Sequence, residues 1–442
     1  AFSNCAKLAD LQLGSSLTTI GESAFWNCTS LSSLTIPENV TTIGDKAFMN
    51  CSGLYEIYNL NNTPQSINAN VFGSLTLGSI TLYTPPTRKA AYEAAAVWKD
   101  FNVKELNAVV DGLYYRINPA SKTAQLTFGE TIPMAYEHLS GKVTVPATIT
   151  YNAVTYTVTE VGNRAFIRNT KITEIVLPEG IVKIGSDCFE GMTNLTAVNI
   201  PSTVTSFDRF GVSNGIVDND NNYTDGLLYI DQCLIKAKST LSGKVTIKEG
   251  TRLIAGEAMR SCKEITEVSI PESVLSIGPS VFTSCSKLSD VNLPSTLRTI
   301  SQYMFQDCSS LGGVKPFAIP QSVTEIEIGA FGWGGTGCTS LYLMRIPDNV
   351  RRIGLFAFWS SAIKQLWLPA GIEEIKDGAF SSLAYLQEIH CAAPDPAAIT
   401  LGITVFDQAP EGVKLFVPYG SKQLYEAAPQ WSAFTVIEEN PC

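Results

Sequence analysis

Short runs of alternating apolar and polar residues recur along this chain, and a proline closes many of them. In LSSLTIPENVTTIG, Leu34 and Ile36 alternate with polar neighbours, which is the spacing of a β-strand with one buried face. Pro37 has no backbone N–H to offer a neighbouring strand, so we expect the strand to end before it. The pattern predicts a β-rich protein built from short strands.

Two further segments complete each unit of the pattern. Val40 and Ile43 are spaced for a tighter turn and a second short strand, with both side chains pointing inward. Phe25 and Cys28, in the segment AFWNC, lie three residues apart, which favours a 3-10 or helical turn with one buried face.

The unit repeats with a period of 23 residues. Between residues 254 and 311 an apolar heading residue, a large apolar residue five positions on and a cysteine three positions later all recur. They are Ile254, Ile277 and Ile300; Met259, Phe282 and Phe305; and Cys262, Cys285 and Cys308. Such a period predicts a β-rich solenoid, in which each coil buries its apolar side by stacking on its neighbours. Equivalent strand residues then form ladders with a spacing of ~4.8 Å.

The period stops and restarts, which predicts two arrays. The first, residues 1–107, is expected to end in a C-terminal cap over 64–107, where an apolar strand, a proline pair and an Ala/Glu/Lys-rich run follow one another. The same order closes the chain over 392–442. Tyr92, Trp98 and Phe101 match Tyr425, Trp431 and Phe434. Because a solenoid must cover its last apolar cross-section, both segments are predicted caps, with a domain boundary near Asn107.

The second array, residues 108–442, is predicted to begin with a β-hairpin cap over 108–160, with turn residues at Asn118 and Pro119. Repeats follow over 161–391. Their interruption at 208–253 repeats the cap's order of features, including LSGKVTV and then LSGKVTI, so we predict a re-used hairpin coil. Two insertions, LGGVKPFAIP and FGWGGTGC, are expected to bulge out of the stack because register resumes after each.

The pattern LxxLxIPxxVxxIGxxAFxxC, as in residues 31–51, resembles the BspA-like leucine-rich repeat. The resemblance covers nearly all of the chain. It implies a leucine-rich repeat right-handed superhelix with one short parallel strand in each repeat and 3-10 or helical turns. It also implies a secreted or surface-anchored protein, as on anaerobic gut and oral bacteria and some protists, associated with adhesion or host-protein binding. The family supplies no shared catalytic or ligand residue.

Composition excludes several kinds of partner. Acidic side chains outnumber basic ones by 41 to 31, which argues against nucleic acid because a nucleic-acid binder needs a basic face. Runs of apolar residues are too short for a membrane-spanning segment. The chain opens within a repeat, without Met or a signal peptide, so we expect a processed or trimmed product. We expect a monomer.

Eleven cysteines in a surface protein raise the possibility of disulfides. Seven of them, however, occupy one repeat position. These are Cys5, Cys28, Cys51, Cys262, Cys285, Cys308 and Cys338. Cysteine is among the most often buried residue types, so we predict buried free thiols.

Candidate chemistry is sparse. A zinc site needs closely spaced Cys or His pairs, and a hydrolytic triad would need His138 or His390, the only two histidines. We predict surface roles for both, with no catalytic residue, metal or cofactor. The run DNDNNYTD at 218–225 begins like an EF-hand loop, but Tyr223 replaces the glycine and Tyr229 the bidentate Glu. We favour a solvated loop and leave calcium binding open.

Outward strand positions of the second array form two columns. One reads Val176, Asn199, Ser269, Asn292, Ala318, Arg345, Trp367 and His390; the other reads Glu174, Ala197, Glu267, Asp290, Pro316, Leu343, Gln365 and Glu388. The first coils are small or acidic, whereas the last three place Arg and Trp, the residues enriched at binding hot spots, beside His. We therefore predict that Leu343, Arg345, Gln365, Trp367, Glu388 and His390 contact an extracellular protein or glycan.

Three alternatives stay open. The cap or the GWGGTGC bulge would cover Trp367 and leave it with a packing role only. The arrays would act as a structural spacer or cell-envelope scaffold with no ligand of their own. An enzyme is the third alternative, although no residue pattern supports it.

Overall fold

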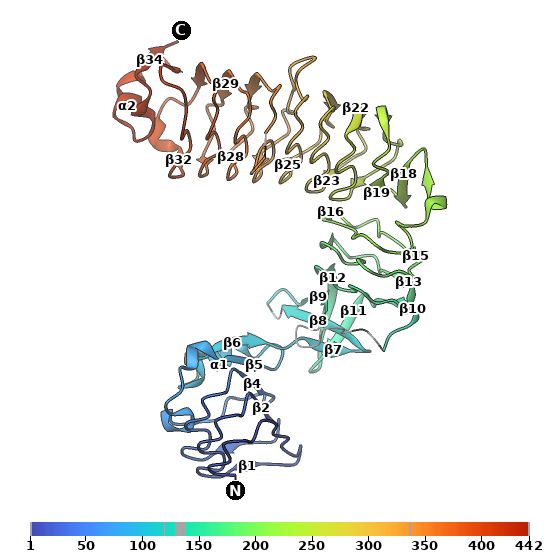
Figure 1. Ribbon diagram of the computed structural model, residues 1–442, viewed down its shortest axis with the longest axis vertical. Helices are drawn as coiled ribbons and strands as arrows, with labels where there is room; N and C mark the ends of the chain where they lie inside the picture. The colour runs from blue at the N-terminus through green and yellow to red at the C-terminus, as the bar shows by residue number, and fades with distance from the viewer. Residues whose placement is uncertain (1, 119, 129–135, 137, 336, 441–442) are drawn as a thin grey trace. The chain divides into compact units, whose positions relative to one another are not determined.

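Short parallel strands, stacked coil upon coil, form the body of the structure, a computed structural model that describes residues 2–118, 120–128, 136, 138–335 and 337–440 (Figure 1). The predicted β-solenoid is confirmed. The chain divides into two units, one of residues 1–137 with 146–159 and one of residues 138–145 with 160–442. The predicted boundary near Asn107 falls within the first unit, and independent folding of residues 108–442 stays a prediction.

In the first unit, β2, β4, β5 and β6 form a parallel sheet, and β1 pairs in parallel with β3. β7, β8 and β9 pair antiparallel in sequence, as do β11 and β12. The bounds are β1 Thr19–Ile20, β2 Ser33–Ile36, β3 Thr42–Ile43, β4 Glu56–Asn59, η1 Ala69–Phe72, η2 Leu77–Ser79, β5 Thr81–Thr84, α1 Lys89–Ala94, η3 Trp98–Asp100, β6 Asn102–Glu105, β7 Ala108–Val110, β8 Leu113–Asn118, β9 Thr123–Thr127, β11 Thr148–Tyr151 and β12 Val154–Val161. The β8–β9 hairpin turns at Asn118, as expected, while Pro119 lies outside the described residues.

The second unit holds six groups of paired strands. They are β10-β13-β15, the end of β12 with β14 and β16, β17-β18-β19-β21-β23, β20-β22-β24, β25-β26-β28-β30-β32 and β27-β29-β31-β33-β34. The bounds are β10 Gly141–Thr144, β13 Ile172–Val176, β14 Lys183–Ile184, β15 Ala197–Val198, β16 Ser206–Phe207, η4 Asp220–Asn222, β17 Tyr223–Thr224, β18 Leu227–Ile230, β19 Cys233–Ala237, β20 Ser242–Thr246, β21 Leu253–Ile254, β22 Glu264–Ser269, β23 Ser276–Ile277, β24 Asp290–Asn292, β25 Thr299–Ile300, β26 Glu325–Ile326, β27 Leu343–Arg345, β28 Arg352–Ile353, β29 Gln365–Leu368, β30 Glu374–Ile375, β31 Glu388–Cys391, η5 Pro396–Ala398, β32 Thr400–Leu401, β33 Lys414–Val417, α2 Lys422–Ala427, η6 Trp431–Ala433 and β34 Val436–Glu439.

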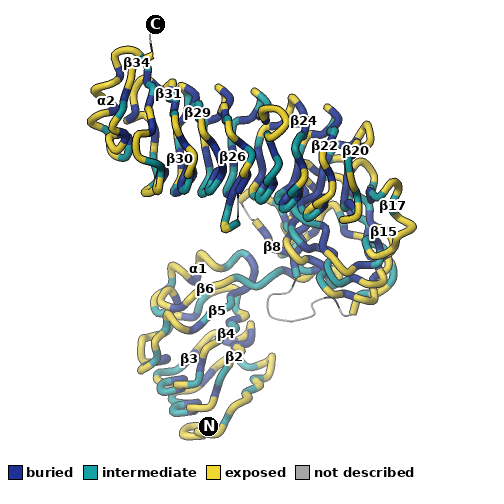
Figure 2. The backbone as a smooth tube through the Cα atoms, turned by 45° about the horizontal axis from the view of Figure 1, so that its top comes forward, coloured by how far each residue is buried: buried dark blue, intermediate teal, exposed yellow. Residues whose placement is uncertain are grey.

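Each coil contributes one row of the core, because its inward strand residues are apolar. Buried positions and exposed or intermediate ones follow one another along the coils (Figure 2). In the first unit Leu34 pairs in register with Ile57, and Ile57 with Leu82, and all three are fully buried. Removing these rows from water is the main source of stability, at ~25 cal/mol per Å² of apolar surface.

Phenylalanines stack directly on one another through both arrays. The longest ladder runs through Phe282, Phe305, Phe331, Phe358, Phe380 and Phe406 at centroid distances of 5.4, 5.4, 4.7, 5.3 and 5.8 Å, with ring planes within 19° of parallel. Offset-stacked rings at this spacing attract one another beyond the area they bury. The predicted Phe ladder is therefore confirmed.

Several cysteines beside ladder positions have a hydrogen-bonding role. The thiols of Cys51, Cys285 and Cys308 donate to the backbone carbonyl of the ladder residue one coil earlier, at 3.2, 3.1 and 3.0 Å. Burial raises the pKa of Cys51 to about 11 and that of Cys285 to about 12, so both thiols remain protonated donors at neutral pH. All ten described cysteines are free and nine are buried. The prediction is wrong for Cys5, which is exposed.

One capping segment closes the last coil of each array, and the two segments match. Tyr92 in α1 donates its hydroxyl to a backbone carbonyl at 2.8 Å, and Tyr425 in α2 does the same at 2.8 Å. Trp98 and Trp431 are buried and pack at an angle on the last ladder phenylalanine, at 5.7 and 5.1 Å between centroids. These side chains cover the apolar end that a repeat would otherwise leave open.

The interruption at 208–253 contains a β-hairpin. β18 and β19 pair antiparallel, and β20 pairs in parallel with β22 through a register shift between Gly243 and Lys244. β10 shows the same shift between Gly141 and Lys142. Both glycines have positive φ, 66° and 69°, a conformation that side chains with a Cβ rarely adopt.

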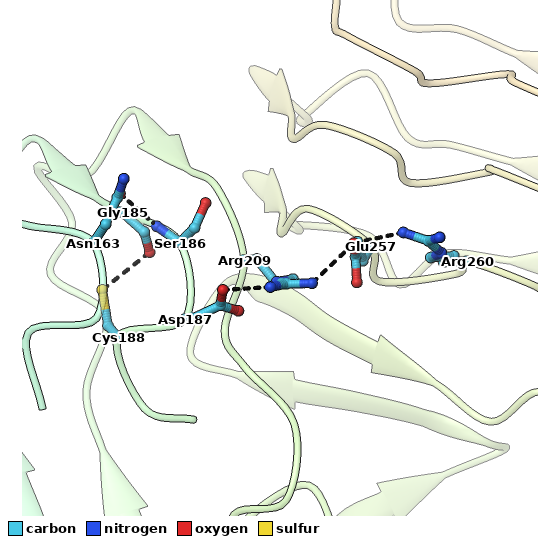
Figure 3. Close-up of polar contacts among 8 residues, drawn as sticks. All are labelled: Asn163, Gly185, Ser186, Asp187, Cys188, Arg209, Glu257 and Arg260. Atoms are coloured by element: carbon cyan, nitrogen blue, oxygen red, sulfur yellow. Dashed lines mark hydrogen bonds and ion pairs between the residues drawn. The ribbon is translucent and has the colours of Figure 1, made fainter. Parts of the chain in front are cut away.

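A chain of ion pairs joins the coils on either side of the interruption in sequence (Figure 3). Arg209 forms ion pairs with Asp187 and, at 3.1 Å, with Glu257, which also binds Arg260 at 2.8 Å. Arg209 also forms an isolated parallel β-bridge with Gly256. The two coils are therefore neighbours although the hairpin separates them in sequence. The Asp187 carboxylate is buried, and the pair with Arg209 supplies the charge it needs.

The two insertions behave differently from each other. The bulge FGWGGTGC packs its Trp333 ring on Tyr303 and Phe356 at the surface. In LGGVKPFAIP, by contrast, Phe317 is buried against Phe305 and Phe331. The expectation that LGGVKPFAIP lies outside the stack is therefore wrong for Phe317, because the Phe317 ring fills space beside the ladder.

Candidate ligand-binding surface

The six predicted contact residues lie together on the outer face of the sheet β27-β29-β31-β33-β34. Leu343 pairs in register with Gln365, and Gln365 with Glu388. In the second column, Arg345, Trp367 and His390 are paired in the same way. The two predicted columns exist because every coil here keeps one strand in a common register, and their role in binding stays a prediction.

The second column is one continuous stack. The Arg345 guanidinium carbon lies 4.0 Å from the centroid of the Trp367 ring, a cation–π contact. Trp367 and His390 stack at 4.8 Å with ring planes 4° apart, and His390 and Phe416 stack at 4.6 Å and 10°. We call Arg345, Trp367, His390 and Phe416 the C-terminal ladder.

Phe416 was not among the predicted residues. It lies in β33, within the capping segment, where the 23-residue period no longer gives the register. The alternation of LFV in that segment, with Leu415 and Val417 inward, was the available signal.

A carboxylate beside the ladder is held by two neighbours. Glu388 accepts a hydrogen bond from the Gln365 amide at 2.8 Å, and the His390 ring nitrogen lies 3.3 Å from the same oxygen. Beneath these residues Met344, Leu366 and Ile389 are fully buried. The surface is consequently rigid, since its side chains stand on a packed core and fix one another.

Arg345 is exposed, whereas the three rings are half-buried because each covers the face of the next. The bulge considered as a cover for Trp367 contacts Tyr303 and Phe356 instead.

The same column has a structural role in earlier coils. Asn199 exchanges two hydrogen bonds with the backbone of Leu177, at 2.8 and 2.9 Å, and Asn292 does the same with Ile270, at 2.9 and 3.1 Å. The predicted column is interrupted at Ala318, because residues 312–320 form no strand and β24 does not pair with β27. The ladder is therefore confined to the last coils.

Other candidate sites offer less. His138 is exposed. In the run 218–225, Asp220 pairs with Lys238 at 2.9 Å, and no cluster of three or more His, Cys, Asp or Glu suited to a metal occurs among the described residues.

A groove of about 710 Å³ lies along the strands β26, β28, β30 and β32. Its lining contains no His or Cys, and three of its four carboxylates, those other than Glu374, have a partner. Glu325 pairs with Arg352 at 3.0 Å, Glu327 accepts from the Gln302 N–H at 2.9 Å, and Asp377 accepts from the Ile403 N–H at 2.7 Å. Burial raises the pKa of Glu327.

Among the residues that the structure describes, none of the helices has the length and apolar character that a membrane span requires.

The stacked parallel strands, the recurring Ile-Gly and Ala-Phe turns and the two caps define a leucine-rich repeat solenoid. The sequence matches the BspA type leucine rich repeat region in 6 copies, over residues 1–90, 147–214, 219–335 and 313–408. The chain belongs to this family.

Solved structures of similar fold include bacterial leucine-rich repeat proteins. One from Bacteroides ovatus is 22% identical, over 75% of this chain and 76% of that one, with a TM-score of 0.36. A leucine rich cell surface protein from Faecalibacterium prausnitzii is 19% identical, over 77% and 96%, with a TM-score of 0.27. The pneumococcal vaccine antigen PcpA is 15% identical, over 77% and 100%, with a TM-score of 0.30. No match was found among curated proteins.

Proposed function

We propose that this chain is a non-enzymatic binding protein of the cell surface, and that the C-terminal ladder is its contact surface for an extracellular protein. The main observation that supports this proposal is the uninterrupted stack of side chains from Arg345 to Phe416. The same column in earlier coils holds asparagines that bond to backbone. An exposed cation and a row of aromatic rings instead supply the residue types that dominate binding energy in protein interfaces.

The stacking favours a protein over a glycan. A sugar ring that packs on an aromatic side chain needs an open ring face. Here Arg345 and His390 lie on the faces of Trp367, Trp367 and Phe416 lie on those of His390, and His390 lies on one face of Phe416. Apart from the second face of Phe416, the stack presents a row of ring edges, which carry partial positive charge and pack well against apolar groups and the faces of other rings. A protein surface offers both.

A cell-surface location is supported by the family, whose members are often surface proteins. The cell surface protein from Faecalibacterium prausnitzii shares its fold with this chain. A non-enzymatic role is supported by the groove, where three of the four carboxylates already have structural partners.

The test is a pull-down of the purified chain against host matrix proteins, mucin and a glycan array. For any protein captured, replacing Trp367 and Arg345 by alanine should weaken binding at least tenfold, which is ~1.4 kcal/mol, without lowering the melting temperature. Tyr385→Ala, an exposed tyrosine outside the ladder, is the matched control and should bind normally. Unchanged affinity in the double variant would favour the spacer. Turnover of glycosidase or protease substrates by the purified chain would favour an enzyme.

A further inference from the structure

The first array carries a smaller ladder at the equivalent place. Tyr58 in β4 and Tyr83 in β5 stack at 4.8 Å with ring planes 8° apart, and both are half-buried. Tyr83 pairs in register with Lys104 in β6, whose side chain is exposed. We call Tyr58, Tyr83 and Lys104 the N-terminal ladder.

The two ladders correspond strand by strand. β4 reads EIYN and β31 reads EIHC; β5 reads TLYT and β33 reads KLFV. β5 and β33 each lead into a capping segment with its six-residue helix. Tyr58 thus takes the place of His390, and Tyr83 that of Phe416.

The polar neighbour is also repeated. The Tyr58 hydroxyl donates to the Glu56 carboxylate at 3.0 Å, just as the His390 ring nitrogen lies 3.3 Å from Glu388. A stacked pair of rings beside an oriented carboxylate therefore occurs twice, built from different aromatic residues. Core packing does not require this, because these residues project from the outer faces of the sheets.

From this repetition we infer that the N-terminal ladder is a second docking surface, so that one chain binds two polypeptide segments of the same chemical kind. This inference rests on the proposed function. Each array would act as one binding module, with its surface next to its cap.

The exposed groups indicate the chemistry of the partner segment. Ring edges favour aromatic or aliphatic side chains, and each ladder carries an exposed cation at one end, Arg345 before Trp367 and Lys104 after Tyr83. The two cations do not hold equivalent positions, because Glu438 in β34 pairs with Phe416 where Lys104 pairs with Tyr83. The carboxylates Glu56 and Glu388 are engaged within the surface. The fitting occupant is a segment that combines apolar side chains with a carboxylate.

The probe is a random peptide library displayed on phage. It would be panned on the full chain, with counter-selection on a chain altered in both ladders. The C-terminal ladder is altered by Arg345→Ala with Trp367→Ala, and the N-terminal ladder by Tyr58→Thr with Tyr83→Thr. Threonine suits an outward strand position, since Thr35 occupies the same column in β2. Protection of the Cys51 thiol reports that the first array remains folded.

Enriched peptides would be synthesised and titrated by calorimetry. We expect the enriched peptides to contain aromatic and acidic residues and to bind with a stoichiometry of two per chain. Altering either ladder alone should leave a stoichiometry of one, and altering both ladders should abolish binding. Exchanging the peptide's acidic residue for its amide should weaken both sites at least fivefold. Tyr55→Ala and Tyr385→Ala, exposed tyrosines outside the ladders, are the controls and should leave two sites.

A stoichiometry of one, lost only with the C-terminal ladder, would overturn the second surface and leave the proposed function standing. Binding that survives alteration of both ladders, or no enrichment over the doubly altered chain, would overturn both. Enrichment of basic peptides would overturn the assigned partner chemistry.

Discussion

Replacing Phe305 by alanine removes one ring from the middle of the longest ladder. Phe305 is fully buried, stacks on Phe282 and Phe331 at 5.4 Å each and meets the edge of Phe317 at 5.2 Å. Truncating a buried phenylalanine costs ~3–5 kcal/mol, and three lost ring pairs at ~0.5–1.5 kcal/mol each place this site at the upper end. With a urea dependence of ~2–3 kcal/mol per M, the unfolding midpoint should fall by ~1–2.5 M.

The assay uses the buried thiols as local reporters. Because a chain with two arrays need not unfold in one step, a single global signal would mix them. Alkylation at increasing urea, with each cysteine quantified by mass spectrometry, separates Cys308 in the affected array from Cys51 in the first array. The Cys308 midpoint should fall while that of Cys51 stays in place.

A matched variant is available within the ladder itself. Met259 holds the same repeat position and is fully buried, so Phe305→Met should keep most of the buried volume, lose only the ring pairs and cost less than Phe305→Ala. An unchanged Cys308 midpoint in Phe305→Ala, or an equal fall at Cys51, would refute the stacking argument.

Three further outcomes are expected. The free energy of unfolding should keep its full value below pH ~9 and fall towards pH ~11, because unfolded thiols ionise near pH 9 whereas burial raises the pKa of Cys51 to about 11. Urea titrations across this pH range check this, and Cys51→Ala should show a smaller fall. Arg209→Met should destabilise its array by ~3 kcal/mol, since the buried Asp187 carboxylate loses its cation; an unmoved alkylation midpoint at Cys188 would contradict this. Residues 108–442 expressed alone should fold, and a molten near-UV circular dichroism spectrum would disprove the boundary.

The sequence was most informative where its period was strict. A fixed spacing places each Phe, each Cys and each outward strand residue over its counterpart, so the Phe ladder and the pairing of Trp367 with His390 were predictable. Where the period breaks, this guidance ends. Phe416 was missed because it lies in the cap.

Two other features could not be predicted for related reasons. Arg209 and Glu257 come together across an inserted hairpin, and no local pattern connects them. The length of the 311–320 insertion does not reveal that Phe317 turns inward.

The thiol-to-carbonyl bonds give the chain an unusual relation to oxidants. A protonated, buried sulfur is a poor nucleophile, so the folded arrays should be indifferent to the redox potential around them. Once unfolded, the same cysteines become reactive, and any disulfide between coils would block the bond to the carbonyl one coil earlier. Oxidising conditions should therefore leave native molecules intact while preventing unfolded ones from returning, so that unfolding acts as an irreversible step in the lifetime of each molecule.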